Sequence, residues 1–319
     1  MAKPLVSWPY LFGGPAHHEP MNSAQSLRGI LLFVTGLFFF ASLDTTLKVL
    51  SAEYPVPMVA ALRYFVNVLL MVAVLGPSRG RQMIQTQRTG WVVVRGLTLA
   101  GATLFMVLAL QRMPVAEATS IVFLSPLVVV LIAGRTLGEK VGMPDWIAAF
   151  VGFLGILLIA RPGADLDLLG VAYACGAIVV LTGYQLLSRI LSASEHTLAL
   201  LFYGAVTGSV VFGMLLPWFW KGGIPPAGHI LLFVLAGTVA TLGHFLFTAA
   251  YKSAEASALA PLMYVQLVWA GLLGWIVFDH VPDHLSMIGM ALVALAGVSV
   301  GVRSHRSRKE AEAMLDTEP

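Results

Sequence analysis

The chain has 319 residues, of which 58% are hydrophobic and only 11% are charged. Soluble domains carry roughly 25% charged residues, so this chain has too few charges to cover a water-facing surface of its size. The net charge of +3 is small and argues against a nucleic-acid partner. A single cysteine, Cys175, excludes an intramolecular disulfide and a cysteine-based metal cage, and its place in an apolar run favours a buried, inert thiol. The composition predicts an integral membrane protein, with the lipid bilayer as its surroundings.

The segment before the first apolar run, residues 1–26, is rich in Pro and Gly and lacks the apolar core of a cleavable signal peptide. We expect it to be a disordered cytoplasmic extension. Met21 directly precedes the first run, so the sequence leaves Met1 and Met21 both open as the start of translation.

Ten apolar runs follow, each close to the roughly 20 residues that a helix needs to cross a bilayer core of about 30 Å. They are separated by short segments rich in Gly, Pro or charge, and they lack the two-residue alternation of barrel strands. The fold class predicted is an all-α membrane protein with ten transmembrane helices. The runs span residues 28–49, 58–76, 91–111, 115–134, 143–161, 168–189, 198–219, 229–250, 255–278 and 284–302.

Lys and Arg are distributed unevenly between alternate connections. With the N-terminus inside, the cytoplasmic segments hold about three times as many of them as the outer connections do, and cytoplasmic loops are the ones enriched in these residues. We therefore expect a multi-pass protein of the bacterial inner membrane with both termini in the cytoplasm, which requires an even number of helices.

An internal repeat appears when the chain is shifted by about 140 residues. Gly29 then falls on Gly170, Leu50-Ser51-Ala52 on Leu191-Ser192-Ala193, and Phe123 on Tyr264. The expected domains are a first repeat at 27–163, a second at 164–303, and a cytoplasmic tail at 304–319. Because each repeat holds five helices, the second enters the membrane from the opposite side, and such inverted repeats are typical of secondary transporters.

The sequence Ala109-Leu110-Gln111-Arg112-Met113-Pro114, followed by Leu124-Ser125-Pro126 and Leu137-Gly138-Glu139-Lys140, resembles the drug/metabolite transporter superfamily, specifically the EamA type. The corresponding segments of the second repeat are Ala254-Glu255-Ala256 and a run that ends at Asp279 in place of Glu. It also carries Gln266-Leu267 where the first repeat has Ser125-Pro126, which indicates two halves that are not equivalent toward the substrate. The resemblance implies a ten-helix transporter and not an enzyme.

Two segments are similar to the EamA branch whose members move solutes of the S-adenosylmethionine and riboflavin type. The first is Asp44-Thr45-Thr46-Leu47-Lys48, followed by Arg63-Tyr64, and the second is Tyr264-Val265-Gln266-Leu267-Val268-Trp269. This resemblance does not choose a substrate.

Ionisable side chains inside a span cost roughly 2.5–3.5 kcal/mol each on insertion scales, so each one needs a reason. Asp44 and Lys48 stand one turn apart on the same helix face and can pair, and Arg63 enters at the same end of the next helix. One interpretation is a polar pocket in which Asp44 takes a proton or a cationic group and Arg63 holds an anionic one. The other is a structural ion pair, with Lys48 reaching toward the headgroups.

Further candidates for substrate binding or coupling lie on the sixth, eighth and ninth helices. His244 is either a proton relay or substrate contact, or a neutral ring bonded to a neighbouring helix. The aromatic and amide side chains suit a flat, partly apolar solute, with lipid-facing or packing roles as the alternative. The candidates are Tyr184, Gln185, His244, Tyr264, Gln266 and Trp269.

Two other groups favour structural roles. Glu117 and Glu255 each open a helix of small residues, where a carboxylate is stabilised by the helix dipole. Between Asp279 and His284 the chain holds two Asp and two His, but Pro282 breaks the helix that would align the histidines. We expect no metal there and no cofactor elsewhere.

The sequence therefore predicts a secondary transporter of a small organic solute that works by alternating access, with protons as a candidate coupling ion. An importer of vitamin- or nucleoside-like solutes and an exporter of amino-acid- or opine-like metabolites stay open, as does a homodimer. A channel or a non-transporting membrane protein is the alternative of another class.

Overall fold

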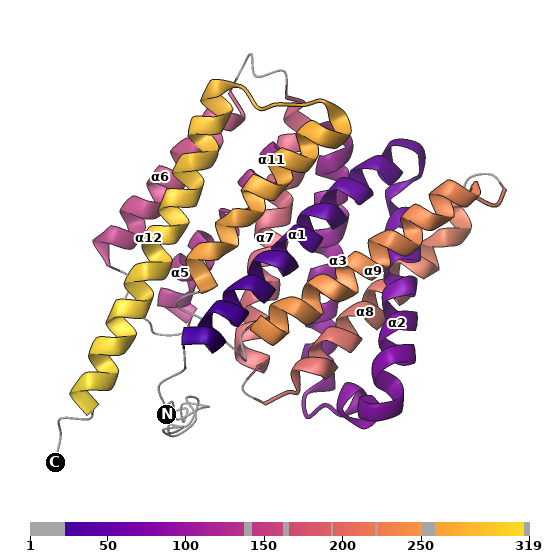
Figure 1. The fold of residues 1–319 in the computed structure, drawn as a ribbon, viewed down its shortest axis with the longest axis horizontal. Helices are drawn as coiled ribbons and strands as arrows, with labels where there is room; N and C mark the ends of the chain where they lie inside the picture. Colours follow the sequence, from indigo (N-terminus) through magenta and orange to yellow (C-terminus); the bar gives the residue numbers. More distant parts are fainter. Residues whose placement is uncertain are drawn as a thin grey trace, which may run out of the picture.

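The computed structural model describes residues 23–136, 142–161, 166–192, 194–220, 223–250 and 259–315, and every regular element within these ranges is a helix (Figure 1). Residues 1–22 of the expected extension, the segment 137–140 and Glu255 lie outside the described residues. In chain order the elements are α1 (Ser23–Glu53), α2 (Val56–Ile84), α3 (Thr89–Arg112), α4 (Val115–Val122), α5 (Ser125–Thr136), α6 (Met143–Ile159), α7 (Leu168–Leu191), α8 (Thr197–Phe219), α9 (Ala227–Ala250), η2 (Ala260–Tyr264), α11 (Val265–Phe278) and α12 (His284–Leu315).

These elements confirm the ten predicted runs. Six helices, namely α1, α2, α3, α7, α8 and α9, are long and apolar enough to cross a membrane, and four shorter apolar stretches account for the other runs. The backbone of α12 continues helically to Leu315, past the expected domain boundary at 303.

The fourth and ninth runs are each broken into two pieces. Between α4 and α5 the chain turns at Phe123-Leu124, just before Pro126, which has no N–H for the helical hydrogen bond. In the ninth run a 3₁₀ turn, η2, holds Pro261 at its start and precedes α11. The two breaks meet, because the rings of Phe123 and Tyr264 lie 5.5 Å apart in an edge-on contact. The residues that the repeat aligns are therefore in contact with each other.

Helix packing follows the same symmetry. The N-terminal helices α1 and α7 of the two repeats each pack on a helix of the other repeat, α1 on α9 and α7 on α3. The pairs α2·α8 and α6·α12 each join equivalent helices, and they lie on opposite sides of the bundle (Figure 1). The arrangement is that of two interlocked repeats, not of two separate domains.

Glycine permits the closest crossings between repeats. A Cβ on Gly237 of α9 would lie 2.5 Å from the side chain of Val66 on α2, and one on Gly96 of α3 would lie 2.7 Å from Thr207 on α8. The repeat shift of about 140 residues carries one contact onto the other. These two crossings fix how α2 meets α9 and how α3 meets α8.

Helix α1 begins, and α12 ends, at the same end of the bundle, which we call the terminal end; the opposite end is the distal end (Figure 1). The largest cluster of buried apolar side chains lies toward the distal end. It includes Leu47 of α1, Leu110 of α3, Val115 of α4 and Phe233 of α9. The distal half of the bundle is thus a packed core.

Cys175 corrects one expectation. The thiol lies on the exposed surface of α7 and is not buried. Periodicity in a continuously apolar run does not separate lipid-facing from protein-facing positions, because both are apolar.

Candidate functional site

A cavity of about 910 Å³ lies between the two repeats. Its walls come from α1, α2 and α3 of the first repeat and from α7, α8 and α9 of the second, with both helix breaks at its edge. The exposed residues Arg79, Gln82 and His196 line it at the terminal end, so it opens there. Leu47 and Val107, which also belong to the distal core, close it at the other end.

Six of the nine predicted site residues line this cavity: Asp44, Arg63, Tyr184, Gln185, His244 and Gln266. The other three lie elsewhere. The hydroxyl of Tyr264 abuts Gly297 on α12, Trp269 packs edge-on against Phe38 of α1, and Lys48 belongs to the distal end.

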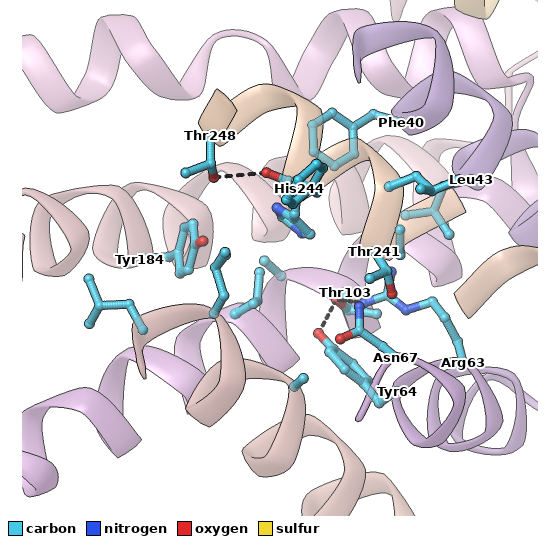
Figure 2. A pocket seen from close by; sticks show the side chains of 18 of the residues that line it. Phe40, Leu43, Arg63, Tyr64, Asn67, Thr103, Tyr184, Thr241, His244 and Thr248 are labelled. Atoms are coloured by element: carbon cyan, nitrogen blue, oxygen red, sulfur yellow. Dashed lines mark hydrogen bonds between the residues drawn. The ribbon is translucent and has the colours of Figure 1, made fainter. Parts of the chain in front are cut away.

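Arg63 presents its guanidinium to the cavity without an ion-pair partner among the described residues. The residue is 9% exposed, and its Nε is buried without a hydrogen-bond partner. One terminal nitrogen lies 3.4 Å from Thr103 Oγ1, and the guanidinium stacks 4.3 Å from the ring of Tyr64. Figure 2 shows the guanidinium beside Thr103, Thr241 and Asn67. Among the described residues no carboxylate lies within ion-pair distance of it, so Arg63 has donors available to an anion.

Asp44 of α1 lines the same cavity as Arg63 of α2. Its carboxylate accepts a long contact of 3.5 Å from Gln266 Nε2. The repeat shift carries this pair onto a second one, in which Gln185 Nε2 donates to Ser125 Oγ at 3.1 Å. The cavity therefore has a polar pair at both repeat-related places, but only the Asp44–Gln266 pair includes an ionisable side chain.

Arg95 is a cavity residue that the sequence analysis missed. It is 5% exposed, and its three nitrogens donate to Ser188 Oγ at 2.7 Å, to Leu200 O at 2.8 Å and to Tyr184 OH at 2.8 Å. These bonds tie α3 to α7 and to α8 and hold the Tyr184 ring in the wall. An arginine four residues into the run 91–111 was the available signal.

The α9 wall carries His244 and three threonines. His244 projects toward the cavity, with its ring 4.9 Å from that of Phe40 (Figure 2). Thr238, Thr241 and Thr248 each donate their hydroxyl to the backbone carbonyl one turn earlier. Their hydroxyl protons are therefore used within the helix, and this wall offers mostly apolar surface.

Lys48 does not form the ion pair with Asp44 that the spacing allowed. Its Nζ donates to the carbonyls of Leu110 and Met113 at 2.7 and 2.8 Å, and it lies 5.5 Å from the ring of Phe278. The last carbonyls of a helix have no intrahelical partner, so they attract the ammonium group to the end of α3. Lys48 therefore ties α1 to the end of α3, an arrangement that neither interpretation of the sequence described.

Polar contacts between the repeats close the distal end. His280 Nε2 lies 2.9 Å from Glu117 Oε1, and Arg112 pairs with Asp167 at 2.6 Å. Arg112 and the backbone N–H of Leu169 lower the pKa of Asp167 in its loop. In a third contact between the repeats, Tyr54 OH lies 2.7 Å from His229 Nδ1.

The histidines of the Asp279-to-His284 segment do not converge. His280 turns to Glu117, whereas Asp283 pairs with Arg161 at the end of α6. Within the described residues no group of three or more His, Cys, Asp or Glu side chains is arranged to hold a metal ion.

The sequence profile of the EamA-like transporter family matches residues 27–161 and 168–301, one match for each repeat. The chain belongs to the EamA-like transporter family. The two matches agree with the two interlocked repeats and with the cavity between them. It is a multi-pass membrane protein and a transporter of a small organic metabolite.

Several named relatives match this chain over nearly their whole length. The riboflavin transporter of Vibrio cholerae is 28% identical over 85% of this chain and 91% of that protein. The pseudopaline exporter of Pseudomonas aeruginosa is 27% identical over 85% and 95%. The S-adenosylmethionine uptake transporter of Rickettsia prowazekii is 26% identical over 86% and 92%. A solved crystal structure with 20% identity superposes with a TM-score of 0.62 over 89% of this chain and 99% of its own, which shows the shared fold.

Proposed function

We propose that the protein is a secondary transporter that works by alternating access, and that the structure is its conformer open at the terminal end. The observation that carries the proposal is one cavity between two inverted repeats, open at one end and closed by a packed core at the other. A carrier of this design moves its solute when the two repeats rock and exchange the open end for the closed one.

We place the protein in the bacterial inner membrane with both termini in the cytoplasm, so that the cavity of this conformer faces the cytoplasm. The excess of Lys and Arg in the connections at the terminal end supports this orientation. Arg79, Arg81 and Arg88 all lie in or beside the connection between α2 and α3.

Arg63 and Asp44 are the groups that we assign to the solute. Arg63 binds an anionic group, because a guanidinium with unused donors in a largely apolar cavity attracts a carboxylate or phosphate. Asp44 takes a proton or a cationic group, which makes it the candidate for proton coupling. Tyr64 and Tyr184 supply aromatic surface on two sides (Figure 2).

The relatives give the first solutes to test. One is named for riboflavin, one for pseudopaline export and one for S-adenosylmethionine uptake, so both directions of transport occur among them. The cavity fits either an importer or an exporter, since the direction of net flux depends on coupling and not on the fold.

The experiment is thermal unfolding of the purified protein with a panel of riboflavin, S-adenosylmethionine, amino acids, opine-type carboxylates, nucleosides and cationic drugs. A ligand at a hundred times its dissociation constant adds about 2.7 kcal/mol to the unfolding free energy. We expect Arg63→Gln to lose the stabilisation and Trp269→Phe, outside the cavity, to keep it. Equal stabilisation of wild type and Arg63→Gln would show that Arg63 does not bind the solute. In a transport assay, flux that never saturates with solute concentration would indicate a channel and not a carrier.

A further inference from the structure

The terminal halves of α2 and α9 diverge after they cross at Val66 and Gly237. Beyond the crossing, α2 packs on α8, where Met71 and Ala205 share a buried cluster. Helix α9 packs instead on α1, where the rings of Phe247 and Phe33 lie 4.8 Å apart. Because each helix has a different partner, neither covers the space between them.

Apolar side chains on both helices border this space, and we call it the lateral cleft. It is lined by Leu70 and Val74 of α2 and by Leu242 and Phe245 of α9, all four of which also line the cavity. Val74 is 69% exposed and Phe245 is 56% exposed. At 1.5 Å per residue, Val74 lies about 12 Å along α2 from the crossing, toward the terminal end. At the cleft, exposed apolar side chains of α2 and α9 therefore also line the cavity.

The repeat-related positions on the other side of the molecule are closed. The repeat shift of about 140 residues carries Val74 onto Leu215 of α8 and Phe245 onto Leu104 of α3. Both leucines are partly buried and pack on the cluster that includes Tyr64 and Phe212. Equivalent side chains are thus packed together in the distal half and separated in the terminal half.

We propose that the solute of this transporter is an amphipathic anion whose apolar part occupies the lateral cleft. Its acidic group lies at Arg63, and its apolar part lies between α2 and α9. This inference rests on the proposed function, because it takes Arg63 as the anion site of the carrier. Charge and surface support it together: the guanidinium has no carboxylate partner in the described chain, and the α9 wall has its threonine hydroxyls bonded to its own backbone.

The test measures the affinity of straight-chain carboxylates from four to twelve carbons for the full-length protein in lipid nanodiscs, at known free aqueous concentration. Burial of each CH₂ group is worth about 0.8 kcal/mol, which is roughly a fourfold tightening per carbon. Val74→Trp fills the mouth of the cleft at an exposed position. Val72→Trp is its matched control, because Val72 is also exposed on α2 but does not line the cavity.

We expect the dissociation constant to fall about three- to fourfold per carbon in wild type and in Val72→Trp. In Val74→Trp the short carboxylates bind as before, but the longer ones gain no further affinity. An unchanged chain-length dependence in Val74→Trp, or none in wild type, would overturn the placement of the apolar chain in the lateral cleft. Failure of the underlying function has a different signature: no carboxylate of any length would bind, or binding would be the same in Arg63→Gln.

Discussion

At the scale of single residues, the cavity keeps an acidic and a basic side chain apart. Arg63 and Asp44 face the same space, yet no ion pair joins them. A buried charge without a partner costs several kcal/mol, so a protein that keeps one in a membrane has a use for it. An anionic group of the solute could neutralise Arg63, and a proton could neutralise Asp44.

Asp44→Asn tests the coupling role of that carboxylate. The amide has nearly the same shape and still contacts Gln266, so we expect the protein to fold and to bind its solute. It cannot release a proton, so uptake into proteoliposomes should lose its response to an imposed pH gradient. Arg63 and His244 line the same cavity and are unaltered in this variant. A retained response to the gradient would assign coupling to another group, with His244→Gln as the next variant.

Lys48→Met separates a structural residue from a binding one. The substitution removes the ammonium that holds the carbonyls of Leu110 and Met113, and a hydrogen bond to a charged group is worth about 1.5–3 kcal/mol. We expect a lower unfolding temperature with an unchanged dissociation constant for the solute. Weaker solute binding at unchanged stability would return Lys48 to the site.

At the scale of elements, hydropathy located all ten spans but not their interruptions. The break before Pro126 follows from the missing N–H of proline, whereas the break before α11 coincides with Pro261, which lies outside the motif that we compared between the repeats. Tyr264 and Trp269 were assigned to the cavity because they lie on the ninth run. Which face of a helix meets the cavity depends on tertiary packing, and a continuously apolar run does not encode it.

The start of α12 carries a pH-dependent contribution to stability. The backbone N–H of Ser286 and the guanidinium of Arg161 lower the pKa of Asp283 to about 2. Its carboxylate therefore stabilises the folded protein above the unfolded pKa of about 3.9, and this contribution is lost as pH falls toward 2. Asp283→Ala should lower the unfolding temperature at pH 7, and the difference from wild type should disappear between pH 4 and pH 2.

Asp283→Asn divides that effect between its two sources. Asparagine is a good helix cap and keeps the bond from Ser286, but it cannot pair with Arg161. We expect an unfolding temperature at pH 7 between those of wild type and Asp283→Ala. A difference that persists below pH 2 would mean that another group is responsible.

At the scale of the whole molecule, the repeat was the most informative part of the sequence. It aligned Phe123 with Tyr264, and the structure brings these two rings into contact. The same shift carries Asp44 onto Gln185, and each of them contacts a polar side chain of the other repeat. The sequence did not predict which end is open, because the repeat makes both ends alike in pattern. That choice depends on side chains that differ between the repeats.

Glu117 joins the two repeats at the distal end, and its substitution should shift the balance between the two conformers. The carboxylate is buried, belongs to the first repeat, and bonds to His280 of the second. Glu117→Gln weakens a charge-assisted hydrogen bond worth about 1.5–3 kcal/mol, which corresponds to a shift of roughly ten- to a hundredfold toward opening of the distal end.

A single cysteine in the cavity reports that shift. In a Cys175→Ser background, Leu43→Cys lies in the cavity wall, and a membrane-impermeant maleimide should label it from the terminal side only. Adding Glu117→Gln should make it reactive from the distal side as well. Glu53→Gln is the matched control, because Glu53 lies at the same end but its side chain is 62% exposed and 3.6 Å from His229, so it should change little. If Glu117→Gln and Glu53→Gln label alike, the distal closure does not depend on the Glu117–His280 contact, and the packed core alone keeps that end shut.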